Sequence, residues 1–469
     1  LVVSYRKTPP TDPQHQIEYW APKADWTVVR TEVITIGPTD RSTLTVAEVL
    51  QDLKSPDAPQ IWKQKFWATP RDSRLLDRLS LYARLRDHVR SPKEKANNKP
   101  WIMAVGFQPF GENDPESSKK SLTLPTRLFI PATSSALDLF ILADDCETLP
   151  SKRVDVRRLI QNTEIFQSPH VLVSEGYTSI AYADFDVSFQ HALRGIHGPA
   201  KDRNLLIFLA AYLRSSLATF FLFHTSSNWG VARPKVHVEE VLRVPLPMPD
   251  QQPDPKRCWQ IVENVAQLVT DAARKAAADF SDRQGIVRAA DAAITPLIEE
   301  YFDVHAMEKP LIEDTLKVTI PSIQPTRRRM PVPTVAPSSI SQREAYCARV
   351  CDMLNDWGKR GTFKVRGTVH GSDAMGIGMA VLEKVSRTDA KSPVKNGDYD
   401  MLKALDHLRQ AYPQRLATLD VVRGLLVFDK NRLYLVKPIS QRHWTQTAAM
   451  NDADEIAGTI LIRPLEGDS

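Results

Sequence analysis

The sequence predicts an α+β protein: a mixed N-terminal domain, a long helical spacer and a smaller C-terminal α+β domain. Short apolar and β-branched runs separated by turn residues occupy residues 100–190. Apolar residues at helical spacing then extend over 256–301, and a proline-rich stretch precedes a final segment of mixed helical and strand patterns. The boundaries are expected at 1–250, 251–317, 318–341 and 342–469.

The length of 469 residues exceeds that of one typical domain. With 42% hydrophobic and 25% charged residues, the composition is that of an ordinary globular protein, and no run of about 18 apolar residues predicts a membrane span. The four cysteines are expected to be buried thiols in a reducing cytoplasm. Because the chain begins at Leu1 rather than Met, we expect an upstream part.

In the first hundred residues the β-branched run 27–36 predicts a strand, and 44–53 predicts a short helix. Apolar residues at helical spacing predict a second helix over 72–90, with Pro70 just before it and Asp72 as its N-cap.

The central region predicts three strands, two short helices and one long helix. The strands are expected at 101–107, 171–174 and 179–183, the short helices near 134–142 and 152–160, and the long helix over 202–223 with Asp202 as its N-cap.

Two amphipathic helices are predicted at 256–280 and 283–301, the second as a returning hairpin. Prolines between 318 and 341, together with the Arg327–Arg329 triplet, predict an extended linker. Beyond it we expect helices over 342–357 and 399–412, and strands at 362–366, 376–385, 425–428 and 433–436, the last two joined by a hairpin turn.

The densest basic region is 60–99, where eleven Lys and Arg outnumber four Asp and Glu, a local charge of +7 against +5 for the whole chain. Arg71, Arg74 and Arg78 are three and four residues apart, which places them on one face near a helix start. Such a cluster of arginines can act as a phosphate clamp. The alternative is a solvated face paired with Asp72 and Asp77. The candidate DNA-binding cations are Lys63, Lys65, Arg71, Arg74 and Arg78.

A second candidate is the loop from Trp229 to Lys235, between an apolar helix and a strand-like segment. Gly230 permits close backbone approach, and Arg233 and Lys235 flank a proline that stiffens the loop. Trp229 offers a ring face for stacking or an indole N–H that can donate to a phosphate. The alternative is that Trp229 packs on the helix end while Arg233 forms a local salt bridge.

Catalytic signals are absent from the sequence. Adenine N6 methylation uses an Asn/Asp-Pro-Pro-Tyr/Phe element around a flipped base, and no such tetrapeptide occurs. No glycine-rich loop for S-adenosylmethionine is found, since Gly376-Ile-Gly lacks a third glycine. The histidines are scattered, and no metal-ligand spacing accompanies the cysteines. We therefore expect no catalytic residue, cofactor or metal site in this chain.

Four segments in order resemble the C-terminal, target-recognition half of large N6-adenine DNA methyltransferases of restriction-modification or phage-defence systems. They are Trp62–Leu79, Glu164–Val173, Asn204–Pro249 and Asp291–Leu316. The recognition region is also similar to that of Type I restriction specificity subunits. The resemblance implies double-stranded DNA as a partner, a methyltransferase or other defence-system protein as a second partner, and S-adenosylmethionine bound by a catalytic part outside this chain.

Residues 342–469 lie outside the resemblance. Arg442, His443 and Trp444 stand beside an acidic helix start and are candidates for docking a partner, or form a surface turn before a capped helix. The first hypothesis for the whole chain is DNA target recognition without catalysis. The alternative is a protein-interaction scaffold of a defence complex that does not read DNA sequence.

Overall fold

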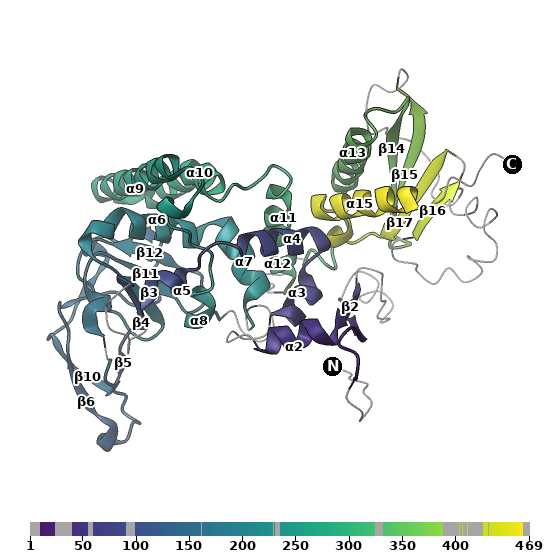
Figure 1. Cartoon of the computed structure of the whole chain (residues 1–469). Coiled ribbons are helices and arrows are strands. Elements are labelled where there is room, and N and C mark those ends of the chain that lie inside the picture. Colours follow the sequence, from purple (N-terminus) through teal and green to yellow (C-terminus); the bar gives the residue numbers. More distant parts are fainter. Residues whose placement is uncertain are drawn as a thin grey trace. The chain divides into compact units, whose positions relative to one another are not determined.

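A computed structural model (Figure 1) describes residues 10–23, 40–54, 60–90, 99–160, 162–227, 229, 235–323, 332–387, 403, 406, 410, 425–429 and 431–462. The chain divides into two compact units, here called the inner unit (Leu75–Ala306) and the terminal unit (Leu1–Arg74 with Met307–Ser469). This division differs from the linear boundaries expected from sequence, because the N-terminal segment belongs with the C-terminal one.

The inner unit is built on a six-stranded mixed sheet whose central strand, β11, is antiparallel to both of its neighbours. The strands in spatial order are β3 (Val89–Arg90), β4 (Trp101–Val105), β13 (Leu193–His197), β11 (His170–Ser174), β12 (Ile180–Ala183) and β8 (Leu139–Phe140). Its core contains Phe107, Phe166, Leu172 and Phe189, all buried. Two smaller sheets adjoin it: β5 (Gln108–Pro109), β10 (Arg153–Arg158) and β6 (Lys120–Thr123) in one, and β7 (Leu128–Phe129) with β9 (Glu147–Thr148) in the other.

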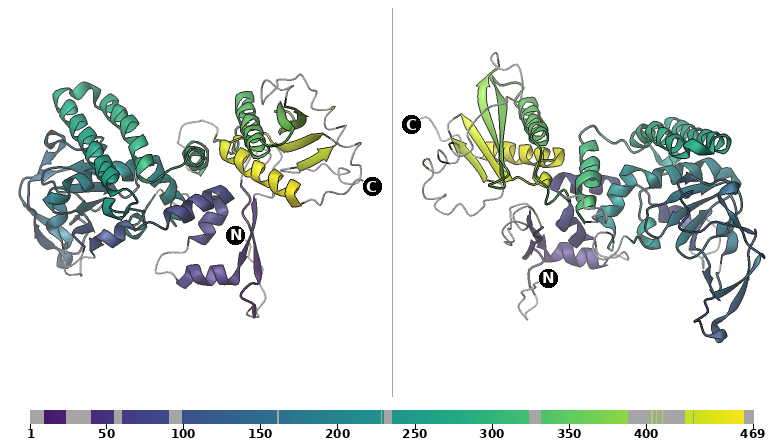
Figure 2. Two further views of the ribbon diagram at one scale, coloured as in Figure 1. Left: turned by 45° about the horizontal axis from the view of Figure 1, so that its top comes forward. Right: turned by 180° about the vertical axis from the view of Figure 1, so that it is seen from behind.

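Two long helices of this unit, α9 and α10, lie side by side (Figure 2), and α9 also packs on α6. Cys258, Ile261, Val265 and Val269 bury one face of α9, as its period predicts. The helices of the unit are α5 (Leu85–His88), α6 (Arg203–Arg214), α7 (Ser216–Thr225), α8 (Val238–Val241), α9 (Pro255–Ala278) and α10 (Arg283–Tyr301).

In the terminal unit, α13 and α15 cover one face of an antiparallel sheet of order β14-β15-β17-β16. Tyr346, Cys347, Leu435 and Trp444 belong to its core. The elements are β1 (Gln16–Trp20), β2 (Arg41–Thr45), α2 (Val46–Lys54), α3 (Ile61–Trp67), α11 (Lys309–Asp314), α12 (Ile320–Ile323), α13 (Ile340–Trp357), β14 (Phe363–Ser372), β15 (Ile377–Ser386), β16 (Leu425–Asp429), β17 (Arg432–Pro438) and α15 (Gln446–Ile462). The unit boundary falls inside α4 (Pro70–Leu79).

The α+β class is confirmed, as are the long helices of 256–301 and the hairpin of β16 and β17. The helices expected near 134–142 and 152–160 were wrong, because β8 and β10 occupy those positions. The helix over 202–223 is broken at Ser215, whose hydroxyl caps α7 by accepting from the Ala218 N–H at 3.2 Å. The strand 27–36 and the helix 399–412 fall outside the continuous described segments.

Two further expectations require correction. The segment 318–341 does not begin as an extended linker, because a π-helical turn over Thr315–Thr319 runs into α12. The helix expected over 72–90 ends at Leu79 and is followed by α5. Asp72 stands at the third helical position, so it is not the N-cap.

No single helix among the described residues is long and apolar enough to cross a membrane. One pair, Ala200–Arg214 with Ser216–Thr225, reaches the required length and composition only when the two are taken together, across a bend of 65°. Most side chains of both helices are buried in the inner unit.

Candidate nucleic-acid interface

A β-ribbon of the inner unit carries the most exposed group of cations in that unit's strands. β6 and β10 pair antiparallel, Arg153 with Thr123 and Val156 with Lys120, and extend away from the six-stranded sheet (Figures 1 and 2). Val156 and Leu122 anchor its base in the core. We call β6, β10 and the loop residues directly before each of them the basic arm; its exposed cations are Lys119, Lys120, Lys152, Arg153, Arg157 and Arg158.

Part of this charge is neutralised within the arm. Arg157 Nη1 lies 3.3 Å from Asp114, and Lys119 Nζ lies 3.3 Å from Asp155. The guanidinium of Arg153 donates to Ser121 at 2.6 Å. The remaining three cations have no ion-pair partner among the described residues, and they are Lys120, Lys152 and Arg158. The arm therefore presents charge that is available to an anionic ligand.

The structure brings Arg71 and Arg74 together, but on a carboxylate of the terminal unit itself. Arg71 donates to Asp454 Oδ2 at 2.9 Å and to Oδ1 at 2.8 Å, and Arg74 Nη2 donates to Oδ2 at 3.0 Å. Partial burial by itself raises the pKa of Asp454, but the hydrogen bonds from the two arginines outweigh it and the pKa is lowered. The predicted phosphate clamp is thus occupied by α15.

The other predicted cations of this segment are not gathered into one face. Lys63 is buried and Lys65 is half-buried on α3. Arg78 lies in the inner unit, where it donates to the Phe302 carbonyl at 3.1 Å. Helical spacing therefore correctly placed Arg71 and Arg74 on one face of α4. Lys63, Lys65 and Arg78 lie in the other environments described above.

The start of α4 is held by its own carboxylate rather than left open to an anion. The Asp72 side chain accepts from the Thr69 N–H at 2.8 Å and from the Thr69 hydroxyl at 2.7 Å. Thr69 is therefore the capping residue, and its hydroxyl accepts from the Asp72 N–H at 3.3 Å. Burial raises the pKa of Asp72 to about 6, and the nearby Asp314 adds to this rise.

The ring of Trp229 packs inward. Trp229 is 7% exposed, and its ring lies 5.8 Å from Tyr177 and 6.1 Å from Phe223. Lys235 forms an ion pair with Glu175 at the turn between β11 and β12. The ring of Trp229 is therefore packed inside the fold, as the alternative interpretation of the sequence expected. Arg233 and Gly230 lie outside the described residues.

Trp444 is a core residue, not a surface one, so its ring is not presented for docking. It is 2% exposed, its indole N–H donates to the Pro438 carbonyl at 2.8 Å, and it packs edge-on against Tyr346 at 5.0 Å. Arg442 Nη1 lies 3.3 Å from the buried Asp40 within the same unit. His443 is half-buried beside them. Arg442 and Trp444 therefore make these contacts inside the terminal unit.

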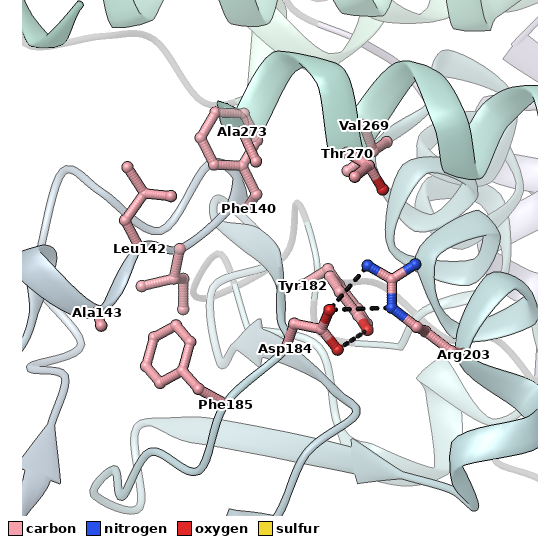
Figure 3. Close-up of a pocket in the computed structure, with 11 residues that line it drawn as sticks. Phe140, Leu142, Ala143, Tyr182, Asp184, Phe185, Arg203, Val269, Thr270 and Ala273 are labelled. Carbon is pink, nitrogen blue, oxygen red and sulfur yellow. Dashed lines mark hydrogen bonds and ion pairs between the residues drawn. The ribbon is translucent and has the colours of Figure 1, made fainter. Parts of the chain in front are cut away.

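A cavity of about 220 Å³, which no sequence motif indicated, lies between the sheet and helices α6 and α9 (Figure 3). Tyr182 donates to Asp184 at 2.8 Å, and Arg203 donates to its other oxygen at 2.9 and 2.7 Å. Burial by itself raises the pKa of Asp184, but these bonds outweigh it and lower the pKa. Both carboxylate oxygens already accept hydrogen bonds, and Phe140 and Phe185 make the remaining lining apolar. The cavity suits a small apolar group rather than acid–base chemistry.

No group of three His, Cys, Asp or Glu side chains converges on a possible metal position within the described ranges. Cys347 and Cys351 are buried free thiols in the core of the terminal unit. None of the clusters of described residues above pairs a nucleophile with a base.

Comparison with known proteins gives a weak structural similarity. No protein-family model and no curated protein matches the chain. The crystal structure of the HsdS subunit from Thermoanaerobacter tengcongensis is 14% identical, with a TM-score of 0.21 over 50% of this chain and 51% of that chain. A structure addressing complex assembly and conformational transition of the type I R-M system is 13% identical, with a TM-score of 0.20 over 50% and 52%. The match thus spans about half the length of each of these chains.

Proposed function

We infer that this chain binds duplex DNA and reads a target sequence as a non-catalytic part of an N6-adenine DNA methyltransferase of a restriction-modification system. The basic arm carries the inference, because an antiparallel ribbon with exposed Lys and Arg has the dimensions and charge that the major groove accepts. The ordered resemblance of four sequence segments to target-recognition regions supports the same reading.

We infer that different residues of the arm contact the phosphates and the base edges. Lys120, Lys152 and Arg158 would contact phosphates, which position the protein without reading sequence. Arg153 and Ser121, already hydrogen-bonded to each other at 2.6 Å, would offer donors to base edges. The Arg157–Asp114 pair, 3.3 Å apart, would keep the loop and strand in register.

Methyl transfer would be performed by a catalytic part that binds S-adenosylmethionine, and this chain would position the target adenine for it. The chain's own contribution is binding energy and register on the duplex. We expect this assembly to act in the cytoplasm, where host and invading DNA meet.

The test replaces the three unpaired cations of the arm, Lys120→Ala/Lys152→Ala/Arg158→Ala, and measures duplex affinity by fluorescence anisotropy between 50 and 250 mM salt. Each lost phosphate contact lowers the slope of log Kd against log salt by about 0.9, so three give up to about 2.7. The control is Arg274→Ala/Lys275→Ala, which removes exposed cations from α9. An unchanged slope in the arm variant, with the fold retained, contradicts the proposal.

The second candidate is a scaffold subunit whose main partner is protein. It is favoured by the occupation of Arg71 and Arg74 by Asp454, since this removes one predicted DNA contact. If the scaffold reading holds, the wild-type chain elutes with a methyltransferase subunit in size-exclusion chromatography but shows no salt-dependent affinity for duplex. Salt-dependent duplex binding that requires the arm argues against it.

A further inference from the structure

One edge of the terminal unit combines exposed aromatic rings with positive charge. Trp357, the last residue of α13, is 54% exposed, and Phe363, the first residue of β14, is 51% exposed. Single exposed aromatic residues are common, but here two occur within seven residues among exposed cations. We call Trp357, Lys359, Arg360, Phe363, Lys384 and Arg387 the aromatic–basic edge.

The backbone holds these residues at one end of the sheet. Phe363 pairs with Ser386 across β14 and β15, which brings Arg387 next to the loop that precedes β14. The guanidinium of Arg387 donates to the Gly361 carbonyl at 2.8 Å and to the Gly358 carbonyl at 2.9 Å. These two bonds fasten the loop between the rings, so both rings are presented from an ordered backbone.

The charge of the edge is strongly positive. Segments 356–364 and 384–387 contain five cations, Lys359, Arg360, Lys364, Lys384 and Arg387, against one carboxylate, Asp356, a net of 5 − 1 = +4. Lys359 Nζ lies 3.6 Å from Asp356. The neighbouring Glu383 is already shared by Arg366 and Arg432, at 2.8 and 3.3 Å. Within these two described segments, cations therefore outnumber carboxylates by five to one.

A cation and an aromatic ring of the edge are also in direct contact. Lys384 Nζ lies over the Phe363 ring, 4.0 Å from its centroid, in a cation–π contact that covers one face of the ring and leaves the other face for stacking. Single-stranded nucleic acid presents the same alternation, with unpaired bases that stack on aromatic rings and phosphates that contact Lys and Arg. A paired duplex hides its base faces, and a membrane contact requires a wider apolar surface than two half-exposed rings.

From these observations we propose that the aromatic–basic edge binds single-stranded DNA. Trp357 and Phe363 stack on unpaired bases, and Lys359, Arg360 and Lys384 contact the adjoining phosphates. This function is separate from duplex recognition by the basic arm. It lies in the part of the chain for which the sequence offered no resemblance.

The test measures binding of the full chain to a fluorescein-labelled 20-nucleotide thymidine strand and to a matched duplex. Trp357→Ala/Phe363→Ala removes both rings, with Trp20→Ala as the control for an exposed tryptophan of the same unit. Since stacking on one ring changes single-strand affinity about 5- to 150-fold, we expect the double variant to raise Kd for the strand at least about 10-fold. Its duplex affinity and thermal midpoint stay unchanged, and Trp20→Ala binds as wild type.

A second variant tests the charges without touching the rings. Lys359→Glu/Arg360→Glu lowers the salt slope of strand binding by about 1.4, because each phosphate contact to a single strand contributes about 0.7. Arg274→Glu/Lys275→Glu applies the same change in net charge to α9. It leaves the slope unchanged if contact is local.

Three outcomes overturn the proposal. The first is wild-type strand affinity in both edge variants. The second is loss of duplex affinity on charge reversal with no effect of removing the rings, which assigns the edge to a duplex backbone. The third is absence of strand binding by the wild type together with ring-dependent sedimentation on phosphatidylserine vesicles, which assigns it to a membrane. None of these readouts depends on the basic arm, whose variants are scored on duplex alone.

Discussion

The buried carboxylate at the start of α4 predicts that the terminal unit loses stability as pH rises from about 4 to about 6. Asp72 is 4% exposed, and one of its oxygens has no hydrogen-bond partner among the described residues. Burial raises its pKa from 3.8 to about 6, so between these values the folded chain binds more protons than the unfolded chain. Stability is then highest at low pH and falls as pH rises. At 1.36 kcal/mol per unit of pKa, the full penalty is about 3 kcal/mol.

The perturbation is Asp72→Asn, which keeps an oxygen acceptor for Thr69 and removes the titration. Linkage between pKa values of 3.8 and about 6 gives a penalty in the wild type of about 1 kcal/mol at pH 4.5 and about 3 kcal/mol at pH 7.5. The variant should therefore gain about 2 kcal/mol relative to wild type across this window. Asp314, whose pKa burial also raises, is present in both proteins.

The assay is urea unfolding of both proteins at pH 4.5, 6.0 and 7.5, followed by far-UV circular dichroism. Thr69→Ala serves as the control, because it removes the capping hydroxyl but leaves the titrating carboxylate in place. A difference between Asp72→Asn and wild type that does not change with pH refutes the reasoning, since it means that Asp72 ionises normally in the folded chain.

Three further predictions concern packing and buried charge. Trp444→Ala lowers the free energy of unfolding by about 3–5 kcal/mol in urea titrations, while the exposed Trp20→Ala leaves it nearly unchanged. Gly367→Ala costs about 1–3 kcal/mol because a Cβ there would lie 2.2 Å from the Cys347 sulfur, and a double-mutant cycle with Cys347→Ala recovers part of it. Arg283→Ala costs about 3–5 kcal/mol because it strands Asp145, whose carboxylate lies 2.8 Å away and is almost fully buried; the exposed Arg288→Ala is its control in thermal unfolding. A midpoint unchanged in any of the three contradicts the assigned packing.

Periodicity predicted the elements whose burial is one-sided and continuous. The buried positions of α9 follow the helical repeat, so its bounds were nearly correct from sequence. Residues 153–158 were misread as a helix although Val154 and Val156 alternate with polar residues, the period of a strand. That alternation was the available signal for the basic arm. The break at Ser215 has no such signal, because both flanking helices are apolar on nearly every side.

The candidate sites show a different limit. Spacing predicts which side chains share a helix face, as it did for Arg71 and Arg74, but not what that face meets. Asp454 lies about 380 residues further along the chain, and no local pattern indicates that the two segments pair. Trp229 and Trp444 were likewise predicted to contact a ligand or partner through their indole rings. Both rings are buried in the fold.

Pairing within the fold therefore separates structural cations from those available for binding. Arg71, Arg74 and Lys235 already have carboxylate partners, so an incoming phosphate must displace a charge-assisted contact before it gains one. Lys120, Lys152 and Arg158 on the arm impose no such cost. Replacing a paired cation with glutamate should thus lower the stability of the fold more than it lowers the affinity for duplex DNA. Replacing an arm cation with glutamate should lower the affinity for duplex DNA more than it lowers the stability. Measuring both quantities on Arg71→Glu and Lys152→Glu distinguishes the two classes, and equal loss of duplex affinity in both variants would show that the Asp454 contact opens when DNA binds.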